Sequence, residues 1–273
     1  MEISLIPTAE QISRESLINK SAVMFDILRA SSTVCTALAN GCQAVLPVSE
    51  VADALALAQS LPEQTCLLGG ERGAVRLPGF HLGNSPSEYT RPVVQGKTII
   101  LTTTNGTRAI RLAAAGSGLV IIGSLLNVTA TARALVAAGR DVALVCAGTR
   151  GQFSLEDTLA AGLVIRQLLK LLPSGEATAP AAAPASDGPY AEERPLYKGR
   201  PLVLTDAAMA ALRLAEYYSA NPLQALHDSL HGQKLVQLGL ASDLAYCAQV
   251  DLLEVVPVYR QGKITLAGEA AVR

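Results

Sequence analysis

The chain contains no tryptophan, and its three Phe and seven Tyr leave an aromatic content of only 4%. Its formal net charge is −1, from 22 basic and 23 acidic residues. A nucleic-acid-binding surface needs a basic stripe and aromatic side chains on which bases stack. We therefore expect no nucleic-acid partner and predict that the protein acts on a small molecule.

Long apolar runs are also missing from the sequence. No stretch approaches the ~18 consecutive apolar residues of a membrane-spanning helix. Residues 1–13 lack the basic start and apolar core of a signal peptide. We expect a cytoplasmic protein with no membrane contact, and a homodimer is the base-rate expectation for its assembly.

Cysteine is scarce and forms no recognisable motif. The five cysteines are odd in number, widely spaced and mostly within apolar segments, which indicates reduced core thiols rather than disulfides. No Cys-x-x-Cys pair suggests zinc. The sequence also lacks a P-loop, a strand-linked G-x-G-x-x-G and a G-x-S-x-G, so nucleotide-fold and serine-hydrolase chemistry have no motif support.

Half of the residues are hydrophobic, which is enough to bury a large core in a 273-residue chain. Short apolar runs alternate with Ala- and Leu-rich stretches, the pattern of an α/β protein. Runs that are apolar on both faces predict a layered α/β/α fold with a largely parallel or mixed central sheet, in which ligands bind beyond the carboxyl ends of the strands. We predict strands at 22–27, 44–48, 66–68, 98–101, 119–122 and 142–146, and helices at 32–40, 51–59, 107–115, 128–138 and 155–172.

Residues 173–201 break this pattern. The segment is rich in Pro, Ala, Ser, Gly and Glu and cannot bury enough side chain to offset its ordering entropy, so it predicts a mobile surface insertion. Helical sequence resumes over 206–248, and one further β-like run covers 252–258. A last segment that returns to the sheet predicts a single unit over 1–273, as one body or as two interlocked lobes.

The polar loop after the predicted strand 98–101 is typical of an anion site. Thr102, Thr103 and Thr104 supply three hydroxyls, and Asn105-Gly106 lets the backbone turn so that N–H groups of the next helix point outward. Phosphate is the commonest ligand of such a loop. The alternative is that these residues only cap the helix.

A second polar cluster follows the predicted strand 22–27. Asp26 could hold Mg²⁺ or attack phosphorus, and the planar fork of Arg29 could bind phosphate or sulfonate oxygens. The structural alternative is an Asp26–Arg29 ion pair with a serine helix cap.

Two further turns carry polar residues near the predicted strand 66–68. Gly69-Gly70 delivers Glu71 as a metal ligand or base and Arg72 as an anion clamp, while Asn84 and Ser85 form a rigid polar turn. The alternative is a charged pair on a solvated turn.

The loop after the predicted strand 142–146 offers Arg150 as a cationic contact and Glu156 as a carboxylate. Ser154 and Asp157 have the spacing of a capping box, so backbone donors alone explain Asp157, whereas Glu156 has no such role and is the better site candidate.

Isolated titratable residues later in the chain have weaker interpretations. His227 and His231 stand four apart, but no intervening glutamate or third ligand supports zinc. Asp206, Asp243 and Asp251 are interpreted as caps or solvated groups.

Six motifs together resemble the 2-phosphosulfolactate phosphatase (ComB) family, and they occur in family order. The match extends to HG at 231–232, Gly239, Asp243 and Asp251, and so covers nearly the whole chain outside the insertion. His81 departs from the pattern, because aspartate is more often expected there. The motifs are FDILRASST at 25–33, GGERG at 69–73, GFHLGNSP at 79–86, TTTNGT at 102–107, GSLLN at 123–127 and AG-x5-LED at 147–157.

The resemblance implies a magnesium-dependent phosphoric monoester hydrolase with an α/β fold of the family's own. Its reaction converts (R)-2-phospho-3-sulfolactate to 3-sulfolactate and phosphate, a step of coenzyme M biosynthesis. The residues agree with that chemistry. Candidates for catalysis and for holding Mg²⁺ are Asp26, Glu71 and Glu156, and candidates for binding the anionic substrate are Arg29, Arg72, Arg150 and the polar turns.

Two routes remain open for the reaction. In one, an acidic base and Mg²⁺ activate water; in the other, Asp26 forms an aspartyl-phosphate that water later cleaves. A phosphometabolite-binding or regulatory protein that keeps the anion site without turnover is the alternative class.

Overall fold

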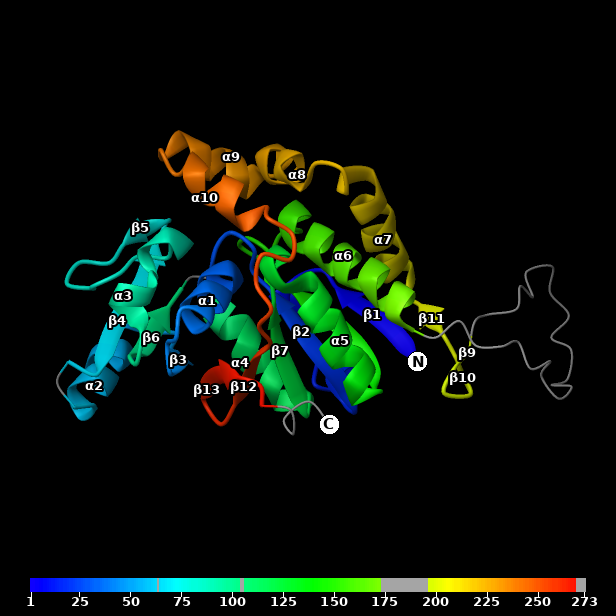
Figure 1. Ribbon diagram of the computed structural model, residues 1–273, viewed down its shortest axis with the longest axis horizontal. Coiled ribbons are helices and arrows are strands. Elements are labelled where there is room, and N and C mark those ends of the chain that lie inside the picture. The colour runs from blue at the N-terminus through cyan, green and yellow to red at the C-terminus, as the bar shows by residue number, and fades with distance from the viewer. Residues whose placement is uncertain (63, 104–105, 173–195, 269–273) are drawn as a thin grey trace, which may run out of the picture.

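The protein is described by a computed structural model that covers residues 1–62, 64–103, 106–172 and 196–268. Its centre is a mixed sheet of eleven strands in the order β11-β1-β8-β2-β7-β12-β13-β3-β6-β4-β5, with helices on both faces (Figure 1). The predicted α/β fold with a mixed central sheet is therefore confirmed. All six strands predicted from the sequence belong to this sheet.

The sheet consists of two parallel groups joined by a hairpin. The first group is β11 (Val203–Leu204), β1 (Glu2–Ile6), β8 (Asp141–Cys146), β2 (Lys20–Phe25) and β7 (Leu119–Gly123). The second is β3 (Ala44–Pro47), β6 (Thr98–Thr102) and β4 (Cys66–Arg72), with β5 (Val75–Arg76) antiparallel at its edge. The hairpin is β12 (Pro257–Arg260) and β13 (Lys263–Leu266).

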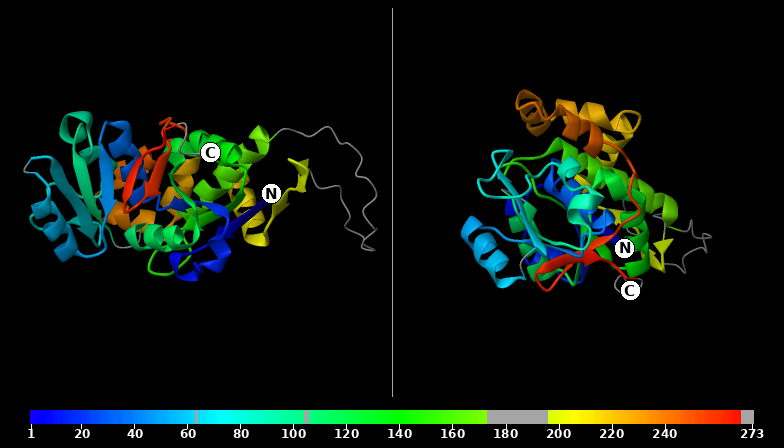
Figure 2. Two further views of the ribbon diagram at one scale, coloured as in Figure 1. Left: turned by 90° about the horizontal axis from the view of Figure 1, so that it is seen from below. Right: turned by 60° about the vertical axis from the view of Figure 1, so that its left-hand side comes forward.

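The hairpin reverses the direction of the sheet. β12 pairs antiparallel with β7 and β13 pairs antiparallel with β3, so the two groups run in opposite directions along the ladder. Figure 2 shows the red hairpin between the green and blue strands of one group and the blue and cyan strands of the other.

Ten helices are described, and the five predicted between residues 30 and 172 are confirmed to within two residues at each end. Helical structure also occupies 206–247, as expected. The helices are α1 (Ala30–Ala39), α2 (Val51–Ser60), α3 (Arg91–Val94), α4 (Gly106–Gly116), α5 (Val128–Ala138), α6 (Leu155–Leu171), α7 (Asp206–Tyr218), α8 (Pro222–Asp228), α9 (Leu230–Gln237) and α10 (Ala241–Cys247).

Alternation along β2 explains how the first group of strands is covered. Val23 and Phe25 belong to the core under α5, α6 and α7, whereas Ala22 and Met24 belong to the core on the opposite face, with α1 and α4. Successive side chains of a strand point to opposite faces. A strand that is covered on both faces is therefore apolar along its whole length. Beyond the apolar run of β2, the first accessible polar side chain is that of Asp26, directly after the last strand residue, Phe25.

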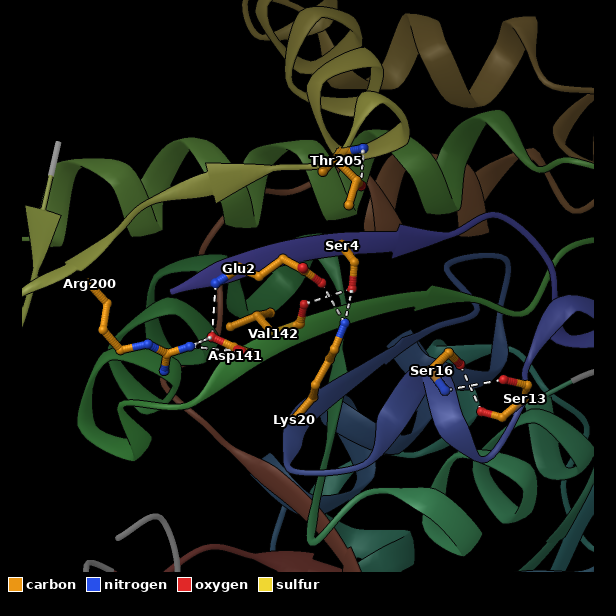
Figure 3. A network of polar contacts seen from close by, with 10 residues as sticks. Glu2, Ser4, Ser13, Ser16, Lys20, Asp141, Val142, Arg200 and Thr205 are labelled. Atoms are coloured by element: carbon orange, nitrogen blue, oxygen red, sulfur yellow. Dashed lines mark hydrogen bonds and ion pairs between the residues drawn. The ribbon is translucent and has the colours of Figure 1, made fainter. Parts of the chain in front are cut away.

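Polar residues at the amino ends of β1, β2 and β8 form a network (Figure 3). This network lies away from the carboxyl ends of these strands. Lys20 donates to a carboxylate oxygen of Glu2 over 2.7 Å. Asp141 accepts hydrogen bonds from the backbone N–H of Glu2 and from the guanidinium of Arg200. These contacts connect the three strands at their amino ends and do not involve their carboxyl ends.

The end of the predicted insertion belongs to the fold. Residues 173–195 lie outside the described part, but β9 (Leu196–Tyr197) and β10 (Arg200–Pro201) form an antiparallel ribbon. Tyr197 is buried and donates its hydroxyl hydrogen to the carbonyl of Val136. The predicted boundary at 201 was therefore too late, because one buried tyrosine and ladder hydrogen bonds order residues 196–201.

The later β-like run was also misplaced. The strand predicted over 252–258 begins only at Pro257 and continues to Arg260. All five cysteines are free, and four of them are buried. Within the described residues, no helix is both long and apolar enough to cross a membrane.

Candidate active site

One cavity of about 320 Å³ collects polar side chains that follow strands of both groups. Its acidic residues are Asp26, after β2, and Glu71, in β4. Asn84, Thr103 and Thr149 contribute neutral polar groups. The cationic side chains are Arg29, Arg150 and Lys234, and His231 adds an imidazole. A volume at the lower end of the range for small-molecule sites suits a compact anionic metabolite.

Asp26 lies between the end of β2 and the start of α4. Its Oδ1 accepts a hydrogen bond from the backbone N–H of Ala30, and a Cβ at Gly106 would stand 2.8 Å from its Oδ2. Only glycine lets the helix approach this closely. Burial raises the pKa of Asp26 to about 7, and the charges of Glu71 and Glu156 act in the same direction.

Glu71 is held by the turn between β4 and β5. The turn residues Gly73 and Ala74 both have positive φ, which suits a tight two-residue hairpin. The backbone N–H of Ala74 donates to Glu71 Oε2 over 2.7 Å. Glu71 is only 8% exposed, so it is not on a solvated turn, the alternative that the sequence left open.

Arg29 is paired with Asp243 rather than with Asp26. The ion pair joins Arg29 Nη1 to Asp243 Oδ2 over 2.5 Å, with both side chains buried. Arg29 Nη2 donates to the carbonyl of Ala74, and Ser85 Oγ donates to Asp243 Oδ1. The Asp26–Arg29 ion pair, the alternative that the sequence left open, does not form, and the interpretation of Asp243 as a cap or solvated group was wrong, because α10 folds back onto the loop after β2.

The serines at the start of α1 also differ from the structural alternative. The helix begins at Ala30, and its N-cap residue, Arg29, makes no side-chain capping bond. Ser31 Oγ instead donates to the carbonyl of Asp26, and Ser32 Oγ donates to the carbonyl of Ile27. These hydroxyls fix the backbone that carries Asp26.

Glu156 and Asp157 are both buried in the first turn of α6. Asp157 accepts hydrogen bonds from the backbone N–H groups of Ile27 and Gly148, and so ties together the loops after β2 and β8. Asp157 therefore accepts hydrogen bonds from backbone donors, as expected. It does not form a capping box, because Ser154 alone caps the helix. Glu156 does not line the cavity, although its charge acts on Asp26. Burial raises the pKa of both carboxyls.

Asn84 lines the cavity, and its buried amide oxygen has no hydrogen-bond partner among the described residues. The residue is 5% exposed, and its backbone carbonyl accepts a hydrogen bond from Thr33 Oγ1. A buried polar atom without a partner costs free energy unless a ligand or water satisfies it. The amide oxygen of Asn84 is therefore available to accept a hydrogen bond or to bind a cation.

Several other predicted binding residues lie outside the cavity lining. Arg72 donates to the carbonyls of Glu71 and Ser49 and to Thr102 Oγ1. Thr102 Oγ1 itself donates to Ser49, and Ser85 holds Asp243. Thr104 and Asn105 lie outside the described residues. Arg150 does line the cavity, from a loop in which it adopts a positive φ of 54° between two glycines of positive φ.

Helix α9 brings Leu230, His231 and Lys234 to the cavity, and no pattern in the sequence assigned them to the site. His227 belongs to α8 and His231 to α9, so the two do not share a helix face. Burial lowers the pKa of His231, and the charges of Lys234 and Arg29 add to this effect. Lys234 stands three positions after His231, a spacing that places both on one face of a helix. Only the tertiary packing shows that this face lines the cavity.

Comparison with known proteins shows the family to which the chain belongs. A family described as 2-phosphosulpholactate phosphatase matches residues 6–262. A probable 2-phosphosulfolactate phosphatase of Symbiobacterium thermophilum is 42% identical over 261 residues, covering 96% of this chain and 98% of the relative. Proteins with the same description in Clostridium acetobutylicum and Caldanaerobacter subterraneus are each 37% identical, covering 97% and 96% of this chain and 100% and 97% of the relatives.

The fold, the acidic and cationic cavity and these matches define an enzyme that hydrolyses phosphoric monoesters. The chain belongs to the 2-phosphosulfolactate phosphatase family.

Proposed function

We propose that the protein hydrolyses (R)-2-phospho-3-sulfolactate to 3-sulfolactate and inorganic phosphate, with Mg²⁺ as its cofactor. The observation that carries the proposal is the meeting of Asp26, Glu71 and Arg150 in one small cavity. A substrate with phosphate, sulfonate and carboxylate groups needs cationic donors, and two carboxylates repel such a substrate unless a cation lies between them. The descriptions of the relatives support the same reaction.

The donor atoms in the cavity fit Mg²⁺. No three His, Cys, Asp or Glu side chains of the described residues form a metal-binding group. Mg²⁺ needs no such cage, since it usually takes one or two carboxylates and completes its octahedron with water and substrate oxygens. Asp26, Glu71 and the unpartnered amide oxygen of Asn84 would hold it. Glu156, outside the lining, acts on Asp26 through its charge.

The remaining residues position the substrate. Bound Mg²⁺ supplies positive charge to the phosphoryl oxygens. Arg150 and the start of α4 beside Asp26 bind the phosphoryl group, because a helix N-terminus and a guanidinium both favour an anion. Water attacks phosphorus in line with the bond to the C2 oxygen and gives a proton to Asp26 Oδ2, the bond between phosphorus and the C2 oxygen breaks, and the C2 oxygen takes a proton from solvent water to become the alcohol.

The test is phosphate release from 2-phosphosulfolactate with and without Mg²⁺. We expect Asp26→Asn to abolish release, and Glu71→Gln to lower it in a way that added Mg²⁺ partly restores. Glu2→Gln, at the amino end of β1, is the matched control and should retain wild-type activity. Release by Asp26→Asn at the wild-type rate would contradict the proposal.

Rapid acid quench separates the two routes to hydrolysis. Labelled substrate should leave no phosphate on the protein if water attacks directly. Label that maps to Asp26 would replace the direct route with an aspartyl-phosphate intermediate.

A further inference from the structure

Strands β2 and β8 separate at their carboxyl ends, beside the cavity. The last pair of their parallel ladder is Phe25 and Cys146, and the backbone N–H of Ala147 still donates to the carbonyl of Phe25 over 2.7 Å. Beyond this bond the first chain leads to Asp26 and the second leads to Arg150, and both of these residues line the cavity. The distance between them therefore depends on what joins the two chains past the last ladder bond.

The carboxylate of Asp157 makes that connection. Its Oδ1 accepts a hydrogen bond from the backbone N–H of Ile27 over 2.8 Å, and its Oδ2 accepts one from the backbone N–H of Gly148 over 3.2 Å. Ile27 directly follows Asp26, and Gly148 stands two positions before Arg150. One buried side chain of α6 thus takes the place of the next ladder bonds between β2 and β8.

The short turn after Gly148 carries this position on to Arg150. Thr149 and Gln152 exchange two backbone hydrogen bonds of 3.0 Å, which close a two-residue turn around Arg150 and Gly151. The φ angles of the two central residues are 54° and 75°, the sign that a type I′ turn requires at both positions. A Cβ at Gly148 would stand 2.6 Å from the carbonyl oxygen of Gln152, so the turn packs against its own start. The turn therefore follows Gly148 as one unit.

Asp26, by contrast, is also held from α1. Its backbone N–H donates to Ser31 Oγ, which in turn donates to the carbonyl of Asp26. Its Oδ1 accepts a hydrogen bond from the backbone N–H of Ala30. These contacts do not involve Asp157. Loss of the hydrogen bonds to Asp157 would therefore move the Arg150 turn relative to Asp26, while Asp26 keeps its place on α1.

Building on the proposed function, we propose that Asp157 is a positioning residue of the phosphatase, which sets the distance between the carboxylate of Asp26 and the guanidinium of Arg150. Asp157 is not part of the cavity lining, so it acts through the two chains that it joins. Both of its oxygens face backbone N–H donors. An asparagine would present its own NH₂ group to one of these donors, so a carboxylate suits this place and an amide of the same size does not.

Asp157→Asn tests the proposal with little change in side-chain volume. We expect it to lower kcat for 2-phosphosulfolactate roughly 10- to 100-fold, because a displacement of about 1 Å near reacting groups can cost 10²-fold. Thr158→Val is the matched control. Thr158 is the next residue of α6 and is equally buried, but its hydroxyl donates within the helix to the carbonyl of Ser154. This control should keep the wild-type kcat per folded molecule.

A double-mutant cycle with Arg150→Ala separates positioning from a general loss of stability. If Asp157 acts through the place of Arg150, Asp157→Asn should lower kcat much less once the guanidinium has been removed. Asp157→Glu, which keeps both acceptor oxygens but holds them one methylene further out, is a second variant for the same cycle if Asp157→Asn does not fold. An equal fold-loss in the two backgrounds, or an unchanged kcat in the single variants, would overturn the proposal.

Hydrolysis of p-nitrophenyl phosphate, a simple phosphoric monoester, distinguishes this proposal from the proposed function. If the wild type hydrolyses this ester but not 2-phosphosulfolactate, the proposed substrate is wrong, and the cycle measured with p-nitrophenyl phosphate still decides the role of Asp157. Equal fold-losses measured with 2-phosphosulfolactate would overturn the role of Asp157 and leave the proposed function intact. Hydrolysis of neither ester by the wild type would contradict both proposals.

Discussion

The guanidinium of Arg29 and the carboxylate of Asp243 form a buried ion pair between residues 214 positions apart in the sequence. Arg29 follows β2 and also binds the carbonyl of Ala74 in the β4–β5 turn, while Asp243 is in α10 and also accepts from Ser85. This pair therefore connects four separate parts of the chain: the loop after β2, the β4–β5 turn, the turn at Ser85 and α10. Removing one member would leave a buried charge without its partner.

Asp243→Ala should lower the free energy of unfolding by about 3–5 kcal/mol, the usual cost of breaking a buried pair. Denaturant unfolding measures this difference. Glu216→Ala is the matched control, since it removes an exposed pair with Arg213 whose contribution is below about 1 kcal/mol. Similar losses in the two variants would show that burial of the Arg29 pair is unimportant.

Asp26 should make the metal-free protein less stable as the pH rises. Burial raises its pKa from 3.8 to about 7, so between these values the folded state binds more protons than the unfolded state. The contribution of protonated Asp26 to stability is fully present below the pKa that this carboxyl has in the unfolded state. It is lost as the pH rises through the pKa of Asp26 in the folded state. Asp26→Asn removes part of this dependence; Glu156 and Asp157, whose pKa values are also raised, retain the rest.

We therefore expect Asp26→Asn to raise Tm at pH 8 without Mg²⁺ by about 2–6 °C, corresponding to about 1–3 kcal/mol. Thermal unfolding from pH 4 to pH 8 checks this, with exposed Asp206→Asn as the control. A lower Tm for Asp26→Asn at pH 8 would argue that the carboxylate stabilises the fold.

Gly106→Ala should impair catalysis more than folding. The added Cβ would stand 2.8 Å from Asp26 Oδ2 and 3.0 Å from the Cβ of Ala30, so the carboxylate or the start of α4 must shift. Because a displacement of about 1 Å near reacting groups can cost 10²-fold, we expect kcat to fall at least tenfold. Gly118→Ala is the control, since its Cβ meets only the flexible end of Arg140. Equal kcat values in the two variants would contradict the role given to this contact.

Gly162→Ala should reduce stability without changing the cavity. A Cβ there would lie 2.0 Å from the carbonyl oxygen of Ala211, where α6 and α7 pack closely. Overpacking of this kind typically costs about 1–3 kcal/mol. Chemical unfolding should show that loss, while kcat per folded molecule stays at the wild-type value. A large loss of kcat would instead link α6 packing to the site.

Local patterns were enough to predict the strands and the polar clusters that follow them. The buried runs that end at Phe25 and Thr102 are recognisable because strands covered on both faces are apolar throughout. Asp26 and Glu71 were candidates because each comes where such a run ends. These inferences use only neighbours in the sequence, and the family motifs reinforce them.

Other features depended on contacts between distant segments. The β12–β13 hairpin enters between two parallel groups and reverses the sheet, which no local pattern in 252–266 indicates. Asp157 looked like half of a capping box, yet its oxygens are used by Ile27 and Gly148.

The sequence by itself determined the α/β class, the main strands and the carboxylates at their ends, because hydrophobic periodicity and turn chemistry act over a few residues. Tertiary structure alone decided that Arg29 is neutralised by Asp243, that Glu156 lies outside the cavity lining, and that Lys234 belongs to that lining. A charged side chain has the same local sequence signature whether it faces solvent, a partner or a substrate. Its role depends on which distant segment removes it from water.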